Sequence, residues 1–285
     1  MVSRAELYSR VRELLENSGA DSPRFDAQCI FQQAFGASFP RIMMDRELPV
    51  HPETEEKILD MAQKRSGGYP LQYILGEWEF YGYPFKVGEG VLIPRPDTET
   101  LVETALSRVR DGGNLRIADL CSGTGCVAVA VEKNISCDEI YAVENSDKAF
   151  AYLTENIRLN NSSVTAVRGD VLAEETAEKF NDLDMIVSNP PYLSREDMDS
   201  LQREVSFEPA EALAAGDDDL YYYRNITRLW KKSLRPGGII AYEIGMDQHD
   251  GVAGILRSNG FINIEFTKDT AGIIRVVSAE KQEEN

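Results

Sequence analysis

The chain has 285 residues, of which 42% are hydrophobic, so it is long enough for one large or two ordinary domains with a full-sized core. Its formal net charge of −18 excludes a broad positive field for a nucleic-acid backbone. Four cysteines without a Cys-x-x-Cys pair and only two histidines predict no metal site. The lack of a long apolar stretch predicts a protein of the cytoplasm without a membrane-spanning segment.

The first part of the chain, residues 1–75, has the periodicity of a small helical bundle. Ser3 and Glu6 form a capping-box pattern, and a proline follows both Ser22 and His51 at the first position of a further helix. The residues that helical spacing places in the core are Leu7, Val11, Leu14, Leu15, Ala27, Ile30, Phe31, Ala34, Ile58, Leu59 and Ala62. We therefore predict a helical domain over residues 1–75.

A glycine-punctuated aromatic stretch in residues 76–95 predicts a β-hairpin linker. The two prolines of an Ile-Pro-Arg-Pro segment then hold the chain extended, and Asp97 or Thr98 can cap a helix over residues 101–109. Such a linker is compatible with two roles. It either packs two domains together or forms a lid beside a pocket.

From residue 96 to residue 285 the chain has the pattern of a nucleotide-type α/β domain. The predicted strands are residues 115–121, 139–144, 164–170, 184–188 and 239–244, and the predicted helices after them are residues 127–131, 147–160, 220–234 and 248–258. Residues 262–266 and 274–277 close the chain as an antiparallel pair. This alternation predicts an α/β fold with a mostly parallel sheet and helices on both faces.

Three successive strand ends carry residues suited to an adenosyl ligand. The first strand ends in a tight turn of Cys121-Ser122-Gly123-Thr124-Gly125, where a ligand can approach the backbone at a helix N-terminus. This turn differs from the Gly-x-Gly-x-x-Gly of dinucleotide enzymes, because Ala128 occupies the third glycine position. Glu144 ends the second strand, where a carboxylate can bind both ribose hydroxyls, and Asp170 ends the third, near where an adenine would reach.

The fourth strand runs into a stiff corner, Asn189-Pro190-Pro191-Tyr192. Proline has no N–H for a sheet and restricts the residue before it, so the strand must end there. The corner presents the Asn189 amide, the Pro190 carbonyl and the Tyr192 ring at a strand end, where open α/β sheets bind ligands. On its own, such a corner is equally typical of a turn that merely leaves a sheet.

Several of these motifs together resemble a known family. Asp119-Leu120-Cys121-Ser122-Gly123-Thr124-Gly125 is similar to the cofactor loop of S-adenosylmethionine-dependent methyltransferases, and Asn189-Pro190-Pro191-Tyr192 to the motif of those that methylate an amide or amine nitrogen. Gly76-Glu77, Phe80-Tyr81-Gly82 and the run Ile93-Pro94-Arg95-Pro96-Asp97-Thr98-Glu99 resemble the HemK/PrmC family. That family methylates the glutamine of the Gly-Gly-Gln loop in peptide-chain release factors, and the resemblance covers nearly the whole chain.

The resemblance implies a Rossmann-like methyltransferase domain and a role for each motif. Residues 121–125 would wrap the methionine part of S-adenosyl-L-methionine, Glu144 would bind the ribose, and Asp170 and Val171 would flank the adenine. Asn189 would border the cofactor and, with its neighbours, hold the substrate glutamine. The residues that would bind that glutamine are Asn189, Pro190, Pro191 and Tyr192, of which Asn189, Pro190 and Tyr192 are the candidate catalytic residues. S-adenosyl-L-homocysteine would be the product.

The implied partner is a release factor, with residues 1–75 as a substrate-docking domain, and we expect a monomer that contacts neither nucleic acid nor membrane directly. The sequence departs from the family pattern twice. Cys121 stands where many members have glycine, and Gly216-Asp217-Asp218-Asp219 is more acidic than usual. Two other functions are compatible with the motifs. They are an adenine-specific DNA or RNA methyltransferase, which would need base flipping, and a non-catalytic adenosyl-nucleotide-binding module.

Overall fold

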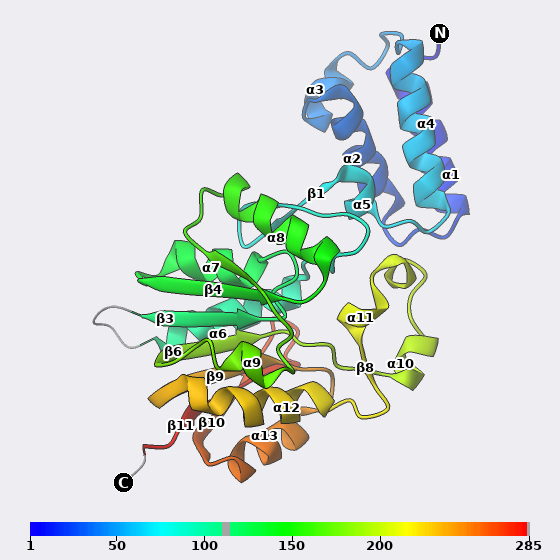
Figure 1. The fold of residues 1–285 in the computed structure, drawn as a ribbon. Helices are drawn as coiled ribbons and strands as arrows, with labels where there is room; N and C mark the ends of the chain where they lie inside the picture. Colours follow the sequence, from blue (N-terminus) through cyan, green and yellow to red (C-terminus); the bar gives the residue numbers. More distant parts are fainter. Residues whose placement is uncertain (110–114, 284–285) are drawn as a thin grey trace. The chain divides into compact units, whose positions relative to one another are not determined.

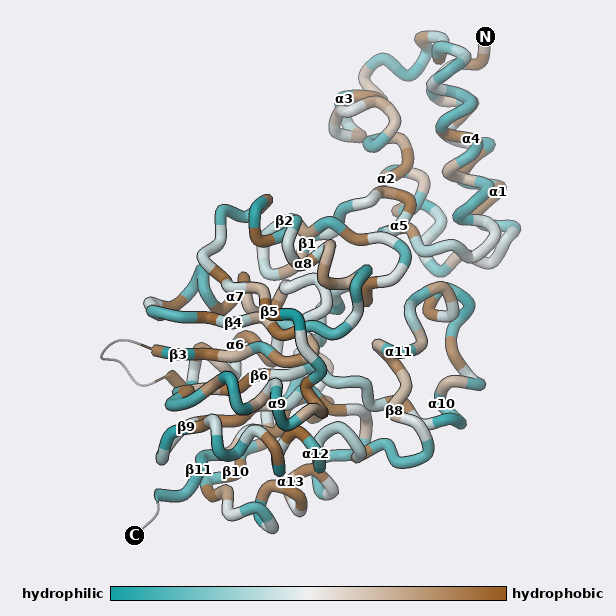
Figure 2. Tube along the Cα trace, in the orientation of Figure 1, coloured by the Kyte–Doolittle hydropathy of each residue, from teal (hydrophilic) through white to brown (hydrophobic). Residues whose placement is uncertain are grey.

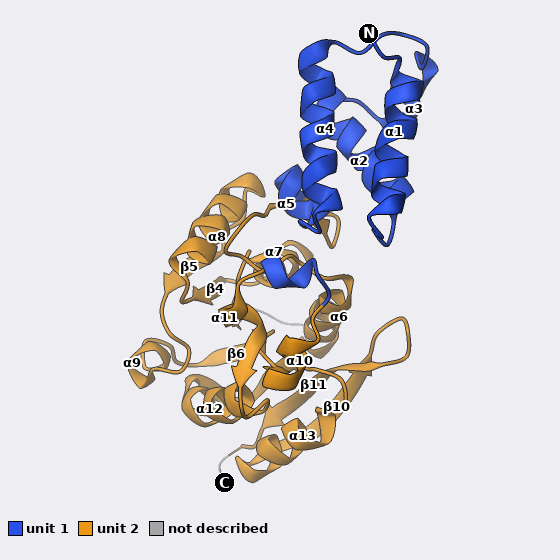
Figure 3. Ribbon diagram, turned by 90° about the vertical axis from the view of Figure 1, so that its right-hand side faces the viewer, with its two compact units in different colours: residues 1–77, 202–207 blue, residues 78–201, 208–285 orange. Residues whose placement is uncertain are grey.

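The computed structural model describes residues 1–109 and 115–283, which form two compact units. Unit 1 comprises Met1–Glu77 and Gln202–Phe207, and unit 2 comprises the described residues of Trp78–Leu201 and Glu208–Asn285, as the colours of Figure 3 show. Nothing in the sequence pattern indicates that residues 202–207 belong with the first unit.

Unit 1 is a helical bundle. Its helices are α1 (Arg4–Asn17), α2 (Pro23–Phe35), α3 (Phe39–Met44), α4 (Pro52–Ser66) and α5 (Leu71–Leu75), with a short 3-10 turn η2 (Val205–Phe207). The capping box is confirmed, because the Ser3 hydroxyl accepts from the Glu6 N–H and the Glu6 carboxylate accepts from the Ser3 N–H. Figure 2 shows α1 and α4 alternating between hydrophilic and hydrophobic residues. Three core predictions are wrong, since Leu14 is 40% exposed and Ala34 and Leu59 are only half-buried.

A buried arginine ties residues 202–207 to the helices of unit 1. Arg65, near the end of α4, is 5% exposed, and its Nε donates to Asp26 Oδ2 of α2 at 2.6 Å. Its Nη2 donates to the Glu204 carboxylate. The ring of Phe207 packs edge-on against Tyr69, with 5.3 Å between ring centroids. The sequence pattern suggested only a helix end at Arg65, whereas this side chain is the centre of an ionic network.

Unit 2 is built around a mixed sheet of seven strands among the described residues, in the order β10-β11-β9-β6-β3-β4-β5. Its strands are β3 (Arg116–Leu120), β4 (Glu139–Glu144), β5 (Thr165–Arg168), β6 (Leu183–Ser188), β9 (Leu234–Glu243), β10 (Phe261–Lys268) and β11 (Ile274–Lys281). The five strands from β9 to β5 are parallel, while β11 is antiparallel to both β9 and β10. The fold class predicted from the sequence is therefore confirmed, including the closing antiparallel pair.

Helices cover both faces of this sheet (Figure 1). One hydrophobic core packs α6 (Glu99–Arg108), α7 (Cys126–Asn134) and α8 (Asp147–Leu159) against the sheet, with the predicted hairpin of β1 (Glu77–Phe80) and β2 (Tyr83–Lys86). The other packs α9 (Glu174–Ala177), α12 (Tyr221–Trp230) and α13 (His249–Ser258). Between β6 and α12 lie β7 (Leu193–Ser194), α10 (Arg195–Asp199), α11 (Ala210–Leu213) and β8 (Ala214–Gly216). No described helix is long and apolar enough to cross a membrane.

Three predicted boundaries in unit 2 are wrong. The helix expected over residues 220–234 ends at Trp230, and a 3-10 turn η3 (Lys231–Ser233) follows it. Strand β9 begins at Leu234, earlier than predicted, because the Pro-Gly-Gly that was expected to end the helix lies inside the strand. The register against β6 shifts at this point, so the proline falls in an irregular stretch where it need not donate a sheet hydrogen bond. Strand β5 stops at Arg168, so Asp170 lies in the loop beyond it.

We predict that Arg65→Met lowers the free energy of unfolding by about 3–5 kcal/mol, because it leaves the buried Asp26 carboxylate without its cation. Urea denaturation of full-length protein measures this loss. As a control, the double variant Arg65→Met with Asp26→Leu also removes the unpaired charge. Its loss of unfolding free energy should be smaller than the sum of the losses of the two single variants. Additive losses would show that Arg65 stabilises the unit by packing alone.

Candidate functional site

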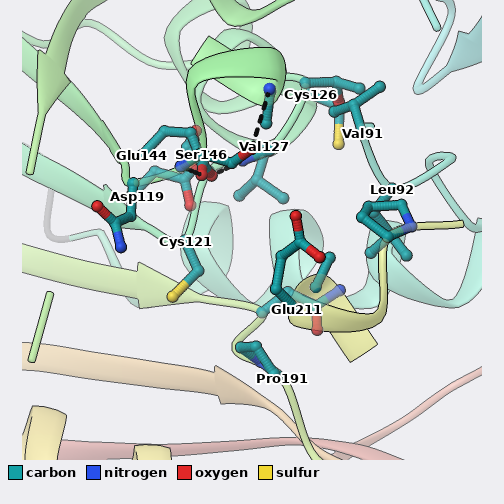
Figure 4. A pocket seen from close by; sticks show the side chains of 18 of the residues that line it. Val91, Leu92, Asp119, Cys121, Cys126, Val127, Glu144, Ser146, Pro191 and Glu211 are labelled. Carbon is teal, nitrogen blue, oxygen red and sulfur yellow. Dashed lines mark hydrogen bonds between the residues drawn. The ribbon is translucent and has the colours of Figure 1, made fainter. Parts of the chain in front are cut away.

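A cavity of about 440 Å³ opens at the carboxyl ends of the parallel strands, within unit 2. This volume lies in the range of small-molecule sites. In Figure 4, Asp119, Glu144 and Ser146 lie on one side of the cavity, Val91 and Leu92 on the opposite side, and Pro191 and Glu211 between them. The predicted site residues that line the cavity are Cys121, Ser122, Gly123, Thr124, Glu144, Asp170, Val171, Asn189 and Pro191. Gly125, Pro190 and Tyr192 are the predicted residues outside that lining.

A buried carboxylate shapes the glycine turn between β3 and α7. Asp119 is 1% exposed, and its Oδ2 accepts from the Ser122 hydroxyl and from the Ala128 N–H at 3.2 Å. Burial raises the pKa of Asp119 to about 7. Gly125 has a φ of 81°, and a Cβ there would lie 2.5 Å from Leu153 Cδ1, so the turn can pack against α8 only with glycine at this position. Asp119 lines the cavity, whereas the sequence analysis gave it no role beyond its place at the start of the loop motif.

Glu144 ends β4 and holds two backbone segments at the cavity wall. Its Oε2 accepts from the Gly123 N–H at 2.9 Å, and its Oε1 accepts from the Ser146 N–H at 2.6 Å (Figure 4). These bonds fix the carboxylate between the glycine turn and the N-terminus of α8. Each carboxylate oxygen can accept more than one hydrogen bond, so both still have acceptor capacity for a ligand.

The loop after β5 forms the next part of the wall. Asp170 Oδ1 accepts from the Leu172 N–H at 2.8 Å, and the Val171 carbonyl accepts from Trp230 Nε1 at 2.8 Å, so both backbone segments are fixed. Tyr222 of α12 also lines the cavity. Tyr222 is the middle one of three successive tyrosines, and such a run carries no sign in the sequence of which ring faces a ligand.

The Asn-Pro-Pro-Tyr corner lies directly after β6, as predicted. The Asn189 Nδ2 donates to Thr98 Oγ1 at 3.3 Å. Thr98 was expected to cap α6, but it makes no such capping bond and lines the cavity instead. The Tyr192 carbonyl accepts from Gln248 Nε2 at 3.0 Å, which fixes the far end of the corner. Burial raises the pKa of the Tyr192 phenol well above its ordinary value, so it stays neutral.

An extended segment between the hairpin and α6, residues 90–95, forms the opposite wall of the cavity. A single side chain holds it. The carboxylate of Glu208, whose side chain is 1% exposed, accepts from the Ile93 N–H at 2.9 Å and from the Arg95 guanidinium. Of the two roles considered for the linker, the position of residues 90–95 favours a wall beside a pocket.

The seven-stranded sheet and the cavity at its strand ends define the class of S-adenosylmethionine-dependent methyltransferases. A family model described as PrmC N-terminal domain matches residues 6–76, and one described as Methyltransferase small domain matches residues 96–217. The solved structure of a T. thermophilus 16S rRNA methyltransferase with AdoMet and guanosine is similar, with a TM-score of 0.52, 19% identity and coverage of 72% of this chain and 50% of that one. At this identity the similarity concerns the fold alone.

Curated relatives of higher sequence identity identify the family. A release factor glutamine methyltransferase of Thermodesulfovibrio yellowstonii is 41% identical over 85% of this chain and 87% of its own. Another, of Moorella thermoacetica, is 35% identical over 100% of both chains. The chain belongs to the family of release factor glutamine methyltransferases.

We predict that Glu208→Ala weakens the binding of S-adenosylmethionine about tenfold or more, because it leaves the Ile93 N–H without its acceptor and Arg95 without its counter-charge. Isothermal titration calorimetry measures the dissociation constant. The matched control is Glu196→Ala on α10, since that carboxylate is exposed and outside the cavity lining. An unchanged dissociation constant for Glu208→Ala would show that residues 90–95 hold their position without it.

Proposed function

We propose that this protein transfers a methyl group from S-adenosyl-L-methionine to the side-chain amide nitrogen of the glutamine in the Gly-Gly-Gln motif of peptide-chain release factors. The observation that carries the proposal is the position of Asn189 in the cavity wall, at the end of β6 and beside the glycine turn. The names of the relatives at 35% and 41% identity support the same substrate.

The residues of the cavity fit this methyl donor. Glu144 offers acceptor capacity for a ribose diol, while Asp170 and Val171 lie where an adenine ring would follow. At Gly123 an added Cβ would meet no atom within 4 Å, so the turn leaves room on its ligand side. We therefore assign Cys121, Ser122, Gly123 and Thr124 to the methionine part of the donor, with Gly125 shaping the turn from behind and S-adenosyl-L-homocysteine as the product.

The chemistry is mainly a matter of alignment. When bound, the donor supplies an electrophilic methyl group on a sulfonium centre. A carboxamide nitrogen is a poor nucleophile because its lone pair is delocalised, so the protein must hold it in line with that methyl group. The Asn189 side-chain oxygen and the Pro190 carbonyl would accept the two substrate N–H bonds. Both acceptors then stabilise the positive charge that develops as the N–C bond forms and the C–S bond breaks.

The remaining parts of the corner complete the substrate site. Tyr192 would pack its ring against the planar amide, and its neutral phenol adds no charge near the reacting nitrogen. Pro191 would fix the direction of the chain beneath the substrate. After transfer the nitrogen loses one of its two protons to solvent, and no metal is required. We further propose that the enzyme acts as a cytoplasmic monomer without direct contact to nucleic acid.

We predict that Asn189→Ala lowers single-turnover methyl transfer to a release factor by about 100-fold or more, because the removed acceptor acts on charge that develops in the transition state. Labelled S-adenosylmethionine measures the transfer, with wild-type protein and three substrates: a release factor, its Gln-to-Ala variant, and DNA. Label in the release factor alone supports the proposal. Label in DNA alone would establish an adenine methyltransferase, and label in no substrate would leave an adenosyl-binding module.

We propose that the helices of residues 1–75 dock the release factor, since a folded protein substrate extends beyond a cavity of about 440 Å³. Removing residues 1–75 should raise the KM for a whole release factor and leave the KM for a short Gly-Gly-Gln peptide unchanged. Circular dichroism of the truncated protein serves as the folding control. Equal losses on both substrates would assign these helices to folding instead.

A further inference from the structure

Directly behind the Asn-Pro-Pro-Tyr corner lies a buried carboxylate that the mechanism above does not use. Glu243 is the last residue of β9, and the residue before it, Tyr242, pairs with Ser188 of β6. Glu243 therefore lies next to Asn189 at the same edge of the sheet. It is 3% exposed, and the polar side chains of Thr98 and Asn189 favour its ionised form. Its Oε2 has no hydrogen-bond partner within residues 1–109 and 115–283.

The charge of Glu243 fixes the direction of any hydrogen bond between it and these two side chains. An ionised carboxylate has no proton to give, so between Glu243 and Thr98 only the hydroxyl can be the donor. The Thr98 oxygen then has only lone pairs left for its second neighbour, and it accepts from Asn189 Nδ2 at 3.3 Å. The amide group of Asn189 is thereby held by its nitrogen end. Its oxygen end, Oδ1, is the end that these two residues leave for the cavity.

We infer that Glu243, acting through Thr98, is a positioning residue that sets the orientation of the Asn189 amide, with Nδ2 turned inward and Oδ1 presented to the substrate. The inference rests on the proposed function and deepens it. Thr98 and Asn189 line the cavity whereas Glu243 does not, so Glu243 acts from behind the substrate site. A reversed Asn189 amide would point an N–H at the substrate N–H, and neither group could accept.

The stability of the fold gains nothing from this carboxylate. Burial, with a smaller contribution from the charge of Asp97, raises the pKa of Glu243 to about 7 against the opposing influence of Thr98, Arg275 and Asn189. Because the folded-state pKa lies above the usual value of a glutamate, the folded protein loses stability as the pH rises from that usual value to about 7. Above that pH the fold contains a desolvated charge, which fits a role in the reaction rather than in stability.

Glu243→Gln tests the inference. A glutamine amide can donate as well as accept, so the hydrogen bonds through Thr98 can run in either direction and the Asn189 amide can reverse. At pH 8 we expect kcat with a release factor to fall about tenfold, while the KM and the dissociation constant of S-adenosylmethionine stay at the wild-type values. The melting temperature should equal or exceed that of wild type, because the variant buries no charge.

Thr98→Val provides a second variant that removes the connecting hydroxyl and changes no charge. We expect a loss of kcat similar to that of Glu243→Gln, and Thr98→Ser should recover most of it. The matched control is Thr104→Val, because Thr104 of α6 is equally buried but its hydroxyl donates to the Thr100 carbonyl, away from the cavity.

Three outcomes would overturn the inference. Wild-type kcat in both Glu243→Gln and Thr98→Val would show that the Asn189 amide needs no such orientation. A lower melting temperature of Glu243→Gln together with weaker cofactor binding would make Glu243 a structural residue. Failure of Thr98→Ser to recover activity would exclude the hydroxyl as the link. The proposed function fails on a different result, namely wild-type protein that leaves the release factor unmethylated.

Discussion

The site depends on one constraint, the parallel pairing of four neighbouring strands. Because β3, β4, β6 and β9 run in the same direction, their carboxyl ends meet at one edge of the sheet. The glycine turn, Glu144, the proline corner and Glu243 each follow or end one of these strands. Residues that are distant in the sequence are thereby brought together around one cavity.

Buried carboxylates then hold the loops at this edge. Asp119 binds the glycine turn, Glu144 joins that turn to α8, Glu208 holds residues 90–95, and Glu243 lies behind Asn189. All four are at most 9% exposed. A buried carboxylate must be satisfied by donors, and for Asp119, Glu144 and Glu208 the donors are mainly the N–H and O–H groups of the loops themselves. The same bonds that make burial tolerable also fix the geometry of the cavity wall.

The sequence predicted the order of the elements and the part of the site that depends on it. Glycine turns, prolines and acidic strand ends are local patterns, so Cys121 to Gly125, Glu144 and Asn189 could be found without a structure. The roles of Glu208 and Glu243 could not be predicted, because the residues around them lie far away in the chain, and an acidic residue in a protein of net charge −18 is usually on the surface. The role of Thr98 could not be predicted either. A threonine before a helix is typical of a helix cap, and nothing near it in the sequence indicates Asn189 as its partner.

Cys121 shows how the turn accommodates a strained residue. Its φ of 60° lies in the left-handed region, as do the φ angles of Gly123 at 55° and Gly125 at 81°. The two glycines adopt such angles freely, but a residue with a side chain does so at a cost of roughly 1–2 kcal/mol. Hydrogen bonds on the residues after Cys121, from Ser122 N to the Val143 carbonyl and from Gly123 N to Glu144, offset that cost. The turn thus keeps its conformation without a glycine at this position, because the anchoring by β4 is independent of the residue type there.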